Sequence, residues 1–211
     1  MASCETKFPA QRKDELTTPP ARSELILIRH APAAAEGRLC GRSDVAIAEG
    51  PYPGLDDLRA MLARVPVVVS SPALRCRQTV ELLWPGRAAP ELDARLLEQD
   101  FGAWDGQLLA ELPDLGRLSA EELAAHRPPG GESFDELCSR VAPALHALAE
   151  RAQQGPLAVV CHAGVVRAAL GLALKAPARG LAFEVAPLSL TRLRCYDGGF
   201  SIIAANWRPA A

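Results

Sequence analysis

The feature that most constrains the fold is a series of short apolar runs that alternate with helical patterns. Three continuous apolar stretches, each too short for a typical helix, indicate fully buried strands: 24–29, 67–69 and 157–161. Apolar residues at helical spacing or helix-start signals predict helices over four other segments: 55–64, 72–84, 133–155 and 165–174. Alternation of this kind predicts an α/β fold, a three-layer α/β/α sandwich around a mainly parallel sheet.

Weaker patterns fill the rest of the chain. A short strand is expected at 91–95, and short helices such as 120–125 are expected within an otherwise irregular stretch, 96–131. The last part of the chain holds three strand-like runs: 181–185, 189–196 and 200–204. The last two would be joined by a hairpin turn at Asp197-Gly198-Gly199.

Composition limits the broad class of protein. We expect residues 1–22 to form a flexible tail and residues 23–211 to form a single domain, with a homodimer left open. A net charge of −2 argues against a nucleic-acid surface. No apolar run reaches the roughly 18 residues of a membrane-spanning helix, and the tail lacks the apolar segment of a secretory signal. The six cysteines show no zinc or redox spacing, which fits reduced thiols in a cytoplasmic protein without a metal or another cofactor.

Two of the three buried strands run directly into a histidine. The first ends at Arg29-His30 and the third continues into His162, while the second leads into a Ser-Ser-Pro segment with Arg75 one turn into the following helix. Adjacent parallel strands place their carboxyl ends at one crevice, where open α/β sheets bind ligands. We therefore expect these four side chains to lie together.

Two arginines and two histidines at one place would repel each other unless an anion neutralised them. Arginine grips phosphate through paired N–H donors, and the N-termini of the helices after Ser71-Pro72 and Gly164 would add further donors. A histidine can attack phosphorus and form a covalent intermediate, while the other groups stabilise the charge on the phosphoryl oxygens. The pattern thus predicts a site for phosphoryl transfer.

A leaving oxygen also needs a proton. The loop around residues 96–102 offers two acids, Glu98 and Asp100. A carboxyl group beside a bound phosphate is disfavoured as an anion, so it can act as a general acid near neutral pH. The spacing of the residues alone does not choose between the two acids.

Over residues 24–205 the chain resembles the histidine phosphatase superfamily, which includes the phosphoglycerate mutases. The resemblance is carried by five segments in order: LIRHA at 27–31, SSPALRCRQT at 70–79, LEQDFGAWDG at 97–106, PGGES at 129–133 and CHAGVVR at 161–167. It implies a phosphoglycerate mutase-like fold, and it implies that His30 is the phosphorylated nucleophile. It also implies that Glu98 protonates the leaving oxygen and then assists water, without any metal ion. By the same resemblance, the groups that bind the phosphoryl oxygens would be Arg29, Arg75, His162 and Ala163.

Within the superfamily, the loop 37–45, GRLCGRSDV, is most similar to α-ribazole phosphatases. Gly41 and Arg42 are its expected substrate contacts, although Arg42 could equally be a solvated loop residue. Alanines at 33–35 and a weakly basic stretch at 107–129 disfavour a mutase, which needs polar ligands and a basic lid. The resemblance implies hydrolysis of a small phosphomonoester, with α-ribazole 5′-phosphate, an intermediate of cobalamin biosynthesis, as the leading substrate. A phosphoglycerate mutase-type transfer and an inactive phosphate-binding scaffold are the alternatives.

Other polar and aromatic residues are expected to be structural. His126 is interpreted as a histidine at the end of a surface helix rather than a substrate ligand, and His146 as a structural residue at core-like spacing. Asp44 is expected to cap or pair locally, Trp104 to pack in the acid loop, and Cys161 to fill the core.

Overall fold

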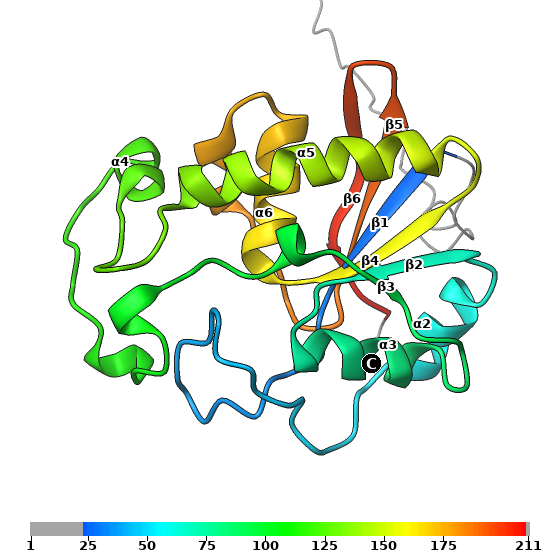
Figure 1. Ribbon diagram of the computed structural model, residues 1–211, viewed down its shortest axis with the longest axis horizontal. Coiled ribbons are helices and arrows are strands. Elements are labelled where there is room, and N and C mark those ends of the chain that lie inside the picture. Colours follow the sequence, from blue (N-terminus) through cyan, green and yellow to red (C-terminus); the bar gives the residue numbers. More distant parts are fainter. Residues whose placement is uncertain (1–22, 210–211) are drawn as a thin grey trace, which may run out of the picture.

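A six-stranded mixed sheet forms the centre of the protein, and the computed structural model describes residues 23–209 (Figure 1). The strands follow the order β3-β2-β4-β1-β5-β6. Their bounds are β1 Glu24–Arg29, β2 Val67–Ser70, β3 Glu91–Leu92, β4 Leu157–Cys161, β5 Leu190–Tyr196 and β6 Gly199–Trp207. The tail predicted for residues 1–22 lies outside the described residues, and the single domain predicted for 23–211 stays a prediction.

The predicted parallel arrangement is confirmed where the candidate site needs it. Strand β4 pairs in parallel with β1 on one side and with β2 on the other, and β2 pairs in parallel with β3. In register, Arg29 lies opposite Cys161, and Ser70 lies opposite Val160. The carboxyl ends of β1, β4 and β2 therefore lie next to one another, while β5 and β6 extend the sheet in the antiparallel direction.

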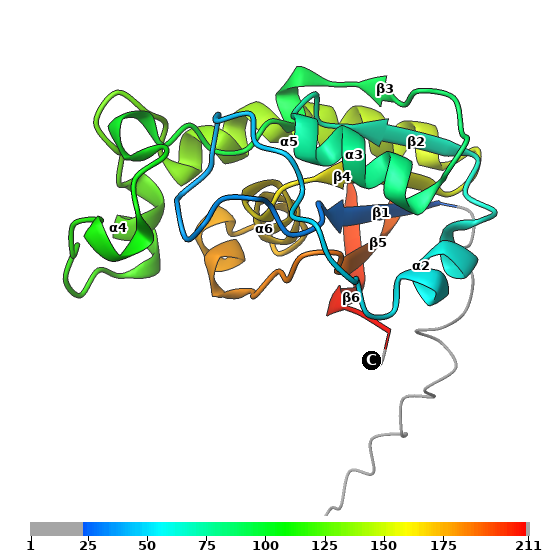
Figure 2. The same ribbon diagram turned by 90° about the horizontal axis from the view of Figure 1, so that it is seen from below.

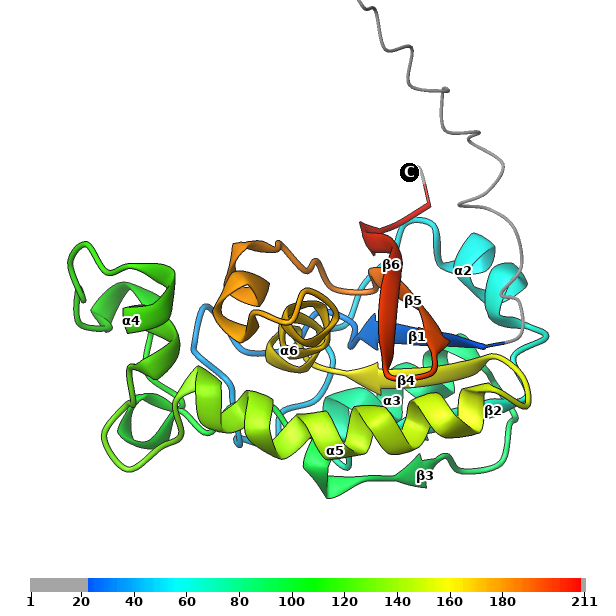
Figure 3. The same cartoon turned by 90° about the horizontal axis from the view of Figure 1, so that it is seen from above.

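Helices cover both faces of the sheet, as the three-layer prediction requires. Their bounds are α2 Leu55–Leu62, α3 Leu74–Leu83, α4 Ala120–Ala125, α5 Phe134–Ala152 and α6 Ala163–Ala173. Figures 2 and 3 view the molecule from opposite sides, with α3 nearer one face of the sheet and α5 nearer the other. A segment that includes α4 extends away from the sheet.

Strand β1 shows why the sheet needs both helical layers. Leu25 and Leu27 pack in the cluster that contains α5 and α6, whereas Ile26 and Ile28 pack in the cluster that contains α2 and α3. Successive side chains of a strand point to opposite faces, and all four are fully buried. Each such side chain contributes about 1.5–3 kcal/mol by leaving water, so a continuous apolar run is stable only between two layers.

The long helix α5 begins where its sequence indicates. Ser133 caps it, and Glu136 completes a capping box by bonding back to the Ser133 backbone N–H. The helix ends at Ala152, slightly before the predicted end. Its start brings Glu132 and the preceding turn against the acid-bearing loop, which matters for the site described below.

The strand predicted at 181–185 is wrong. Residues 181 and 182 end a 3-10 helix, Pro177–Ala182, and residues 183–185 have no regular secondary structure. The 3-10 helix packs so tightly on α6 that a Cβ on Gly180 would lie 2.1 Å from the carbonyl oxygen of Arg167, and one on Gly171 would lie 2.5 Å from that of Pro177. Close packing of this turn on the helix therefore overrides the local apolar pattern.

No helix within residues 23–209 is both long and apolar enough to cross a membrane. The predicted cytoplasmic location and the question of a homodimer stay as predictions.

Candidate active site

A cavity of about 470 Å³ lies beside the carboxyl ends of β1 and β4. Five of the residues predicted for the site contribute to its wall: Arg29, His30, Arg75, Glu98 and Ala163. Arg29 ends β1 and His30 follows it, Arg75 is in the first turn of α3, and Ala163 begins α6. The sheet register thus brings together groups that are far apart in the sequence, as expected.

His30 is held as a neutral imidazole with one free nitrogen. Its Nδ1 lies 2.7 Å from the carbonyl oxygen of Ala31. A carbonyl can only accept, so Nδ1 carries the proton and Nε2 keeps its lone pair. Burial, together with the positive charges of Arg75 and Arg29, lowers the pKa of His30 to about 3. A buried, uncharged imidazole with an unprotonated Nε2 is suited to nucleophilic attack.

This protonation state can be measured directly. We expect the ring ¹⁵N shifts of His30 to report the neutral Nδ1–H tautomer without titration between about pH 5 and pH 8. The unfolded chain accepts this proton near the ordinary value of 6.5 while the folded protein resists it to about 3. Protonation of the unfolded chain therefore lowers the free energy of unfolding. This effect is absent above pH 6.5 and grows as the pH falls. A midpoint near 6.5 for His30 in the folded protein would contradict this assignment.

His162 lies behind His30 rather than in the cavity wall. It is fully buried, and the centroids of the two imidazole rings are 5.2 Å apart. Burial and the charge of Arg75 hold the pKa of His162 well below its usual value. Its Nε2 lies 2.8 Å from the Oγ of Ser71. The structure therefore places His162 close to the predicted nucleophile, but it does not expose the ring to the cavity.

Ser71 is a site residue that the sequence analysis missed. Its position before Pro72 suggested a helix cap, but α3 begins at Leu74 and has no side-chain cap at its N-cap residue. The backbone N–H of Leu74 instead donates to Asp44 Oδ1 at 2.6 Å, so Asp44 does cap, although its partner lies 30 residues away. The Oγ of Ser71 instead makes its short contact with His162, and it accepts the backbone N–H of Ala73 at a longer 3.4 Å.

Backbone carbonyl groups hold both arginines of the cavity wall. Arg75 is only 1% exposed, and its Nη atoms donate to the carbonyl oxygens of Ser43 and Gly41, each at 2.8 Å. Arg29 donates through Nη1 to Val185. The Nε atoms of both arginines are buried and have no hydrogen-bond partner within residues 23–209. Buried donors without acceptors are costly, and both guanidinium groups belong to residues of the cavity wall, which an anion can approach.

The charged form of Arg29 is disfavoured in this cavity. Burial lowers the pKa of Arg29, and the neighbouring charges of Arg167 and Arg75 lower it further, although Glu98 opposes them. A dianion bound here would relieve the repulsion between these cations. Arg167, which sequence reasoning did not select, also lies in the cavity wall one turn after Ala163.

Gly41 and Arg42 are not brought to the cavity wall. Gly41 contributes its carbonyl oxygen to Arg75, while the Arg42 guanidinium lies 3.6 Å from a carboxylate oxygen of Glu132. The backbone N–H groups of both residues donate to the side chain of Asp105, which sequence reasoning also missed. Their role in this structure is to shape the loop that holds Arg75.

The structure distinguishes between the two candidate acids. Glu98 is 7% exposed and lies in the cavity wall, where its Oε1 accepts the backbone N–H of Gly164 at 3.1 Å. Asp100 lies outside the wall, and its Oδ1 accepts the N–H of Gly102 in a local turn. Only Glu98 is placed to give a proton to a ligand in the cavity.

Gly164 makes the position of Glu98 possible. A Cβ at this glycine would lie 2.3 Å from Glu98 Oε1 and 2.9 Å from Leu137 Cδ2. We expect Gly164→Ala to displace the Glu98 carboxylate and to lower the free energy of unfolding by about 1–3 kcal/mol, the usual cost of overpacking. A crystal structure of the variant and chemical denaturation would check both effects.

Gly155→Ala is the matched control, because its Cβ would meet only Pro66 Cγ at 3.8 Å. An unmoved Glu98 carboxylate in Gly164→Ala would show that the contact does not restrict this side chain.

The remaining predicted structural residues lie outside the cavity wall. His126 ends α4 and stacks on Trp104 with ring centroids 5.4 Å apart, and Cys161 is fully buried. His146 is exposed on α5 beside Phe200, so its expected core placement is wrong, because its position on the helix faces away from the apolar stripe. Within residues 23–209, no group of three or more His, Cys, Asp or Glu side chains is arranged to hold a metal ion.

Comparisons with known proteins agree with this architecture. The family model described as the histidine phosphatase superfamily (branch 1) matches residues 25–208. A bifunctional protein of Mycobacterium tuberculosis is 30% identical over 197 residues, which cover 87% of this chain and 54% of that protein. The chain therefore spans about half the length of this curated relative.

Solved structures share the fold. A mycobacterial glucosyl-3-phosphoglycerate phosphatase in complex with VO3 superposes with a TM-score of 0.75 at 25% identity, covering 88% of this chain and 99% of that one. An α-ribazole phosphatase from Shigella flexneri superposes with a TM-score of 0.74 at 23% identity, covering 89% and 98%.

Proposed function

Because this chain belongs to the histidine phosphatase superfamily, branch 1, we propose that it is a metal-independent phosphomonoesterase that works through a phosphohistidine. The observation that carries the proposal is a neutral His30 in the same cavity wall as Arg29 and Arg75, whose positive charges help to lower its pKa. A nucleophile near cationic groups is an arrangement suited to the phosphoryl group of a monoester.

In the first half-reaction, His30 Nε2 attacks phosphorus while the bond from phosphorus to the leaving oxygen breaks. The leaving oxygen takes the proton of the Glu98 carboxyl group, so the alcohol departs uncharged. Arg29 and Arg75 stabilise the charge on the phosphoryl oxygens, and the N–H groups at the start of α6 add to this field.

In the second half-reaction, a water molecule gives a proton to the Glu98 carboxylate and attacks the phosphorus of the phosphohistidine. The nitrogen–phosphorus bond breaks, inorganic phosphate leaves, and His30 regains its lone pair. His162 faces His30 from behind and, held by Ser71, keeps the nucleophile in place while the charge changes.

We propose α-ribazole 5′-phosphate as the leading substrate. The sequence of loop 37–45 supports it, and so does the apolar part of the cavity wall. That part includes Leu39, Phe101, Leu109 and Phe134. An apolar wall of this kind suits a leaving group that carries an aromatic base.

A substrate panel tests this assignment. The kcat/KM for α-ribazole 5′-phosphate is expected to exceed that for simple sugar phosphates and for 3-phosphoglycerate by about tenfold or more, because burying an aromatic group contributes binding energy of that size. A flat profile would remove the cobalamin-related substrate, and a preference for 3-phosphoglycerate would favour the phosphoglycerate-type alternative. Absence of hydrolysis with every ester would favour the scaffold.

A further inference from the structure

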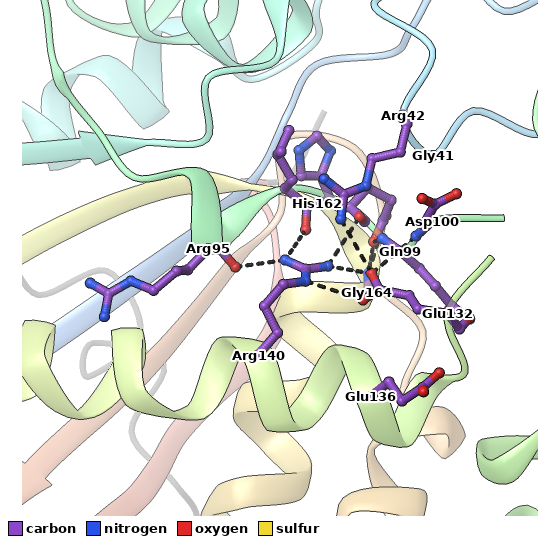
Figure 4. A network of polar contacts seen from close by, with 12 residues as sticks. Gly41, Arg42, Arg95, Gln99, Asp100, Glu132, Glu136, Arg140, His162 and Gly164 are labelled. Carbon is purple, nitrogen blue, oxygen red and sulfur yellow. Dashed lines mark hydrogen bonds and ion pairs between the residues drawn. The ribbon is translucent and has the colours of Figure 1, made fainter. Parts of the chain in front are cut away.

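Arg140, on α5, makes an extensive set of polar contacts just outside the cavity (Figure 4). Its Nη1 donates to the carbonyl oxygens of Arg95 at 2.7 Å and of Leu97 at 3.0 Å, and its Nη2 donates to that of Glu98 at 3.2 Å. Its Nε and Nη2 also bind the two carboxylate oxygens of Glu132. One guanidinium group therefore holds three backbone carbonyls of the loop that carries Glu98.

Glu132 completes the attachment from the other side of this loop. Its carboxylate accepts the backbone N–H of Asp100 at 3.0 Å, and its own backbone N–H donates to the Asp100 carbonyl at 2.8 Å. The side chain of Gln99 donates to the Glu132 carbonyl at 2.9 Å. The segment 95–100 contains only one short 3-10 turn of its own, so these contacts define its path.

We propose that Arg140, supported by Glu132, is the positioning residue that holds the Glu98 carboxyl at the leaving-group oxygen. This inference rests on the proposed function. Arg140 binds the backbone of Glu98, and the Gly164 N–H binds its side chain, so the acid is attached at both ends. A proton donor is effective only within hydrogen-bond reach of its target, so releasing the backbone end displaces it.

The Glu132 carboxylate also connects the loop that carries Glu98 with the loop 37–45, which contacts Arg75. Arg42 lies 3.6 Å from Glu132, and the neighbouring residues Gly41 and Ser43 accept from Arg75. Ion pairs with exposed partners contribute little because water screens them, and the Arg42 side chain is 33% exposed. Arg140, with a shorter and doubly bonded contact to Glu132, is therefore the member of this network expected to matter most.

Leaving-group chemistry separates a positioning role from a purely structural one. An alkyl phosphate releases an alkoxide that must be protonated as it leaves, whereas 4-nitrophenyl phosphate releases an anion that is stable near neutral pH. In the first half-reaction a displaced acid slows the alkyl ester much more than the aryl ester, whereas loss of folded protein slows both equally. The value of kcat/KM reports this half-reaction alone and excludes the later attack of water, which Glu98 assists for both esters.

The experiment compares Arg140→Gln with the wild type on glycerol phosphate and on 4-nitrophenyl phosphate. We expect kcat/KM to fall about 10- to 100-fold with the alkyl ester and less than about threefold with the aryl ester, the scale of a misplaced catalytic group. Arg140→Lys is expected to recover part of the alkyl activity, because an ammonium group can reach some of the same acceptors.

Arg151→Gln is the matched control. Arg151 lies in the last turn of the same helix and pairs with Glu91 at 2.8 Å, away from the cavity, so neither substrate is expected to respond. Glu132→Gln provides a second test if Arg140→Gln fails to fold. It keeps the shape of the side chain but removes the ion pair with Arg140 and weakens the hydrogen bonds between them.

Equal losses of kcat/KM with both esters in Arg140→Gln or Glu132→Gln, with an active wild type, would overturn the positioning role alone. A wild type that is inactive on both esters would overturn the proposed function, and the inference with it.

Discussion

Replacing His30 with alanine is expected to lower kcat for 4-nitrophenyl phosphate by roughly 10⁴-fold or more, the scale on which enzymes lose activity when a covalent nucleophile is removed. The structure explains why no neighbour can substitute. His162 is fully buried and its Nε2 is already within hydrogen-bond distance of Ser71. Cys40 lies in the cavity wall, but burial, its largest influence, raises the pKa of its thiol, which disfavours the reactive thiolate. Steady-state kinetics would measure the loss.

Two further observations make this test specific. Wild type incubated with ³²P-labelled substrate and quenched in alkaline detergent should retain base-stable, acid-labile label, and His30→Ala should retain none. His146→Ala removes an exposed histidine from α5 and serves as the control with unchanged kcat. Hydrolysis by His30→Ala at the wild-type rate would exclude His30 as the nucleophile.

Glu98→Gln is expected to produce the second largest effect. The amide keeps the size of the side chain but cannot give up a proton to the leaving oxygen, so kcat for an alkyl phosphate should fall by about 10²- to 10⁴-fold. For 4-nitrophenyl phosphate the first step needs little protonation, so a burst of 4-nitrophenol followed by slow turnover is expected. The slow phase arises because the amide also cannot accept a proton from the attacking water.

Asp100→Asn is the matched comparison for this variant. Asp100 lies two residues further along the same loop, and its side chain bonds to Gly102 outside the cavity wall. Asp100→Asn is expected to show neither the loss of kcat with alkyl phosphates nor the burst with 4-nitrophenyl phosphate. If Asp100→Asn reproduced the selective loss and Glu98→Gln did not, Asp100 would be the acid and the assignment made from cavity geometry would be wrong.

Much of the fold could be predicted because its signals are local. A strand buried on both faces carries a continuous apolar run, so the runs at 25–28 and 157–161 identify their strands without information from other segments. The stretch 181–185 shows the limit of this reasoning, because its first two residues end a 3-10 turn packed on α6 and the other three form no regular element. Apolar composition reports burial, but over five residues it does not report which element is buried.

The sequence by itself determined the α/β class, the strands that end at Arg29 and Cys161, and the set of chemical groups gathered there. It did so because strand periodicity and the convergence of parallel strand ends are properties of short segments. Only the tertiary structure decided that Glu98 rather than Asp100 faces the cavity. It alone also placed Ser71 on His162, 91 residues away, and Arg140 on the acid loop. Hydrogen bonds between segments so distant leave no periodic trace in the chain, since they depend on how the loops close over the sheet.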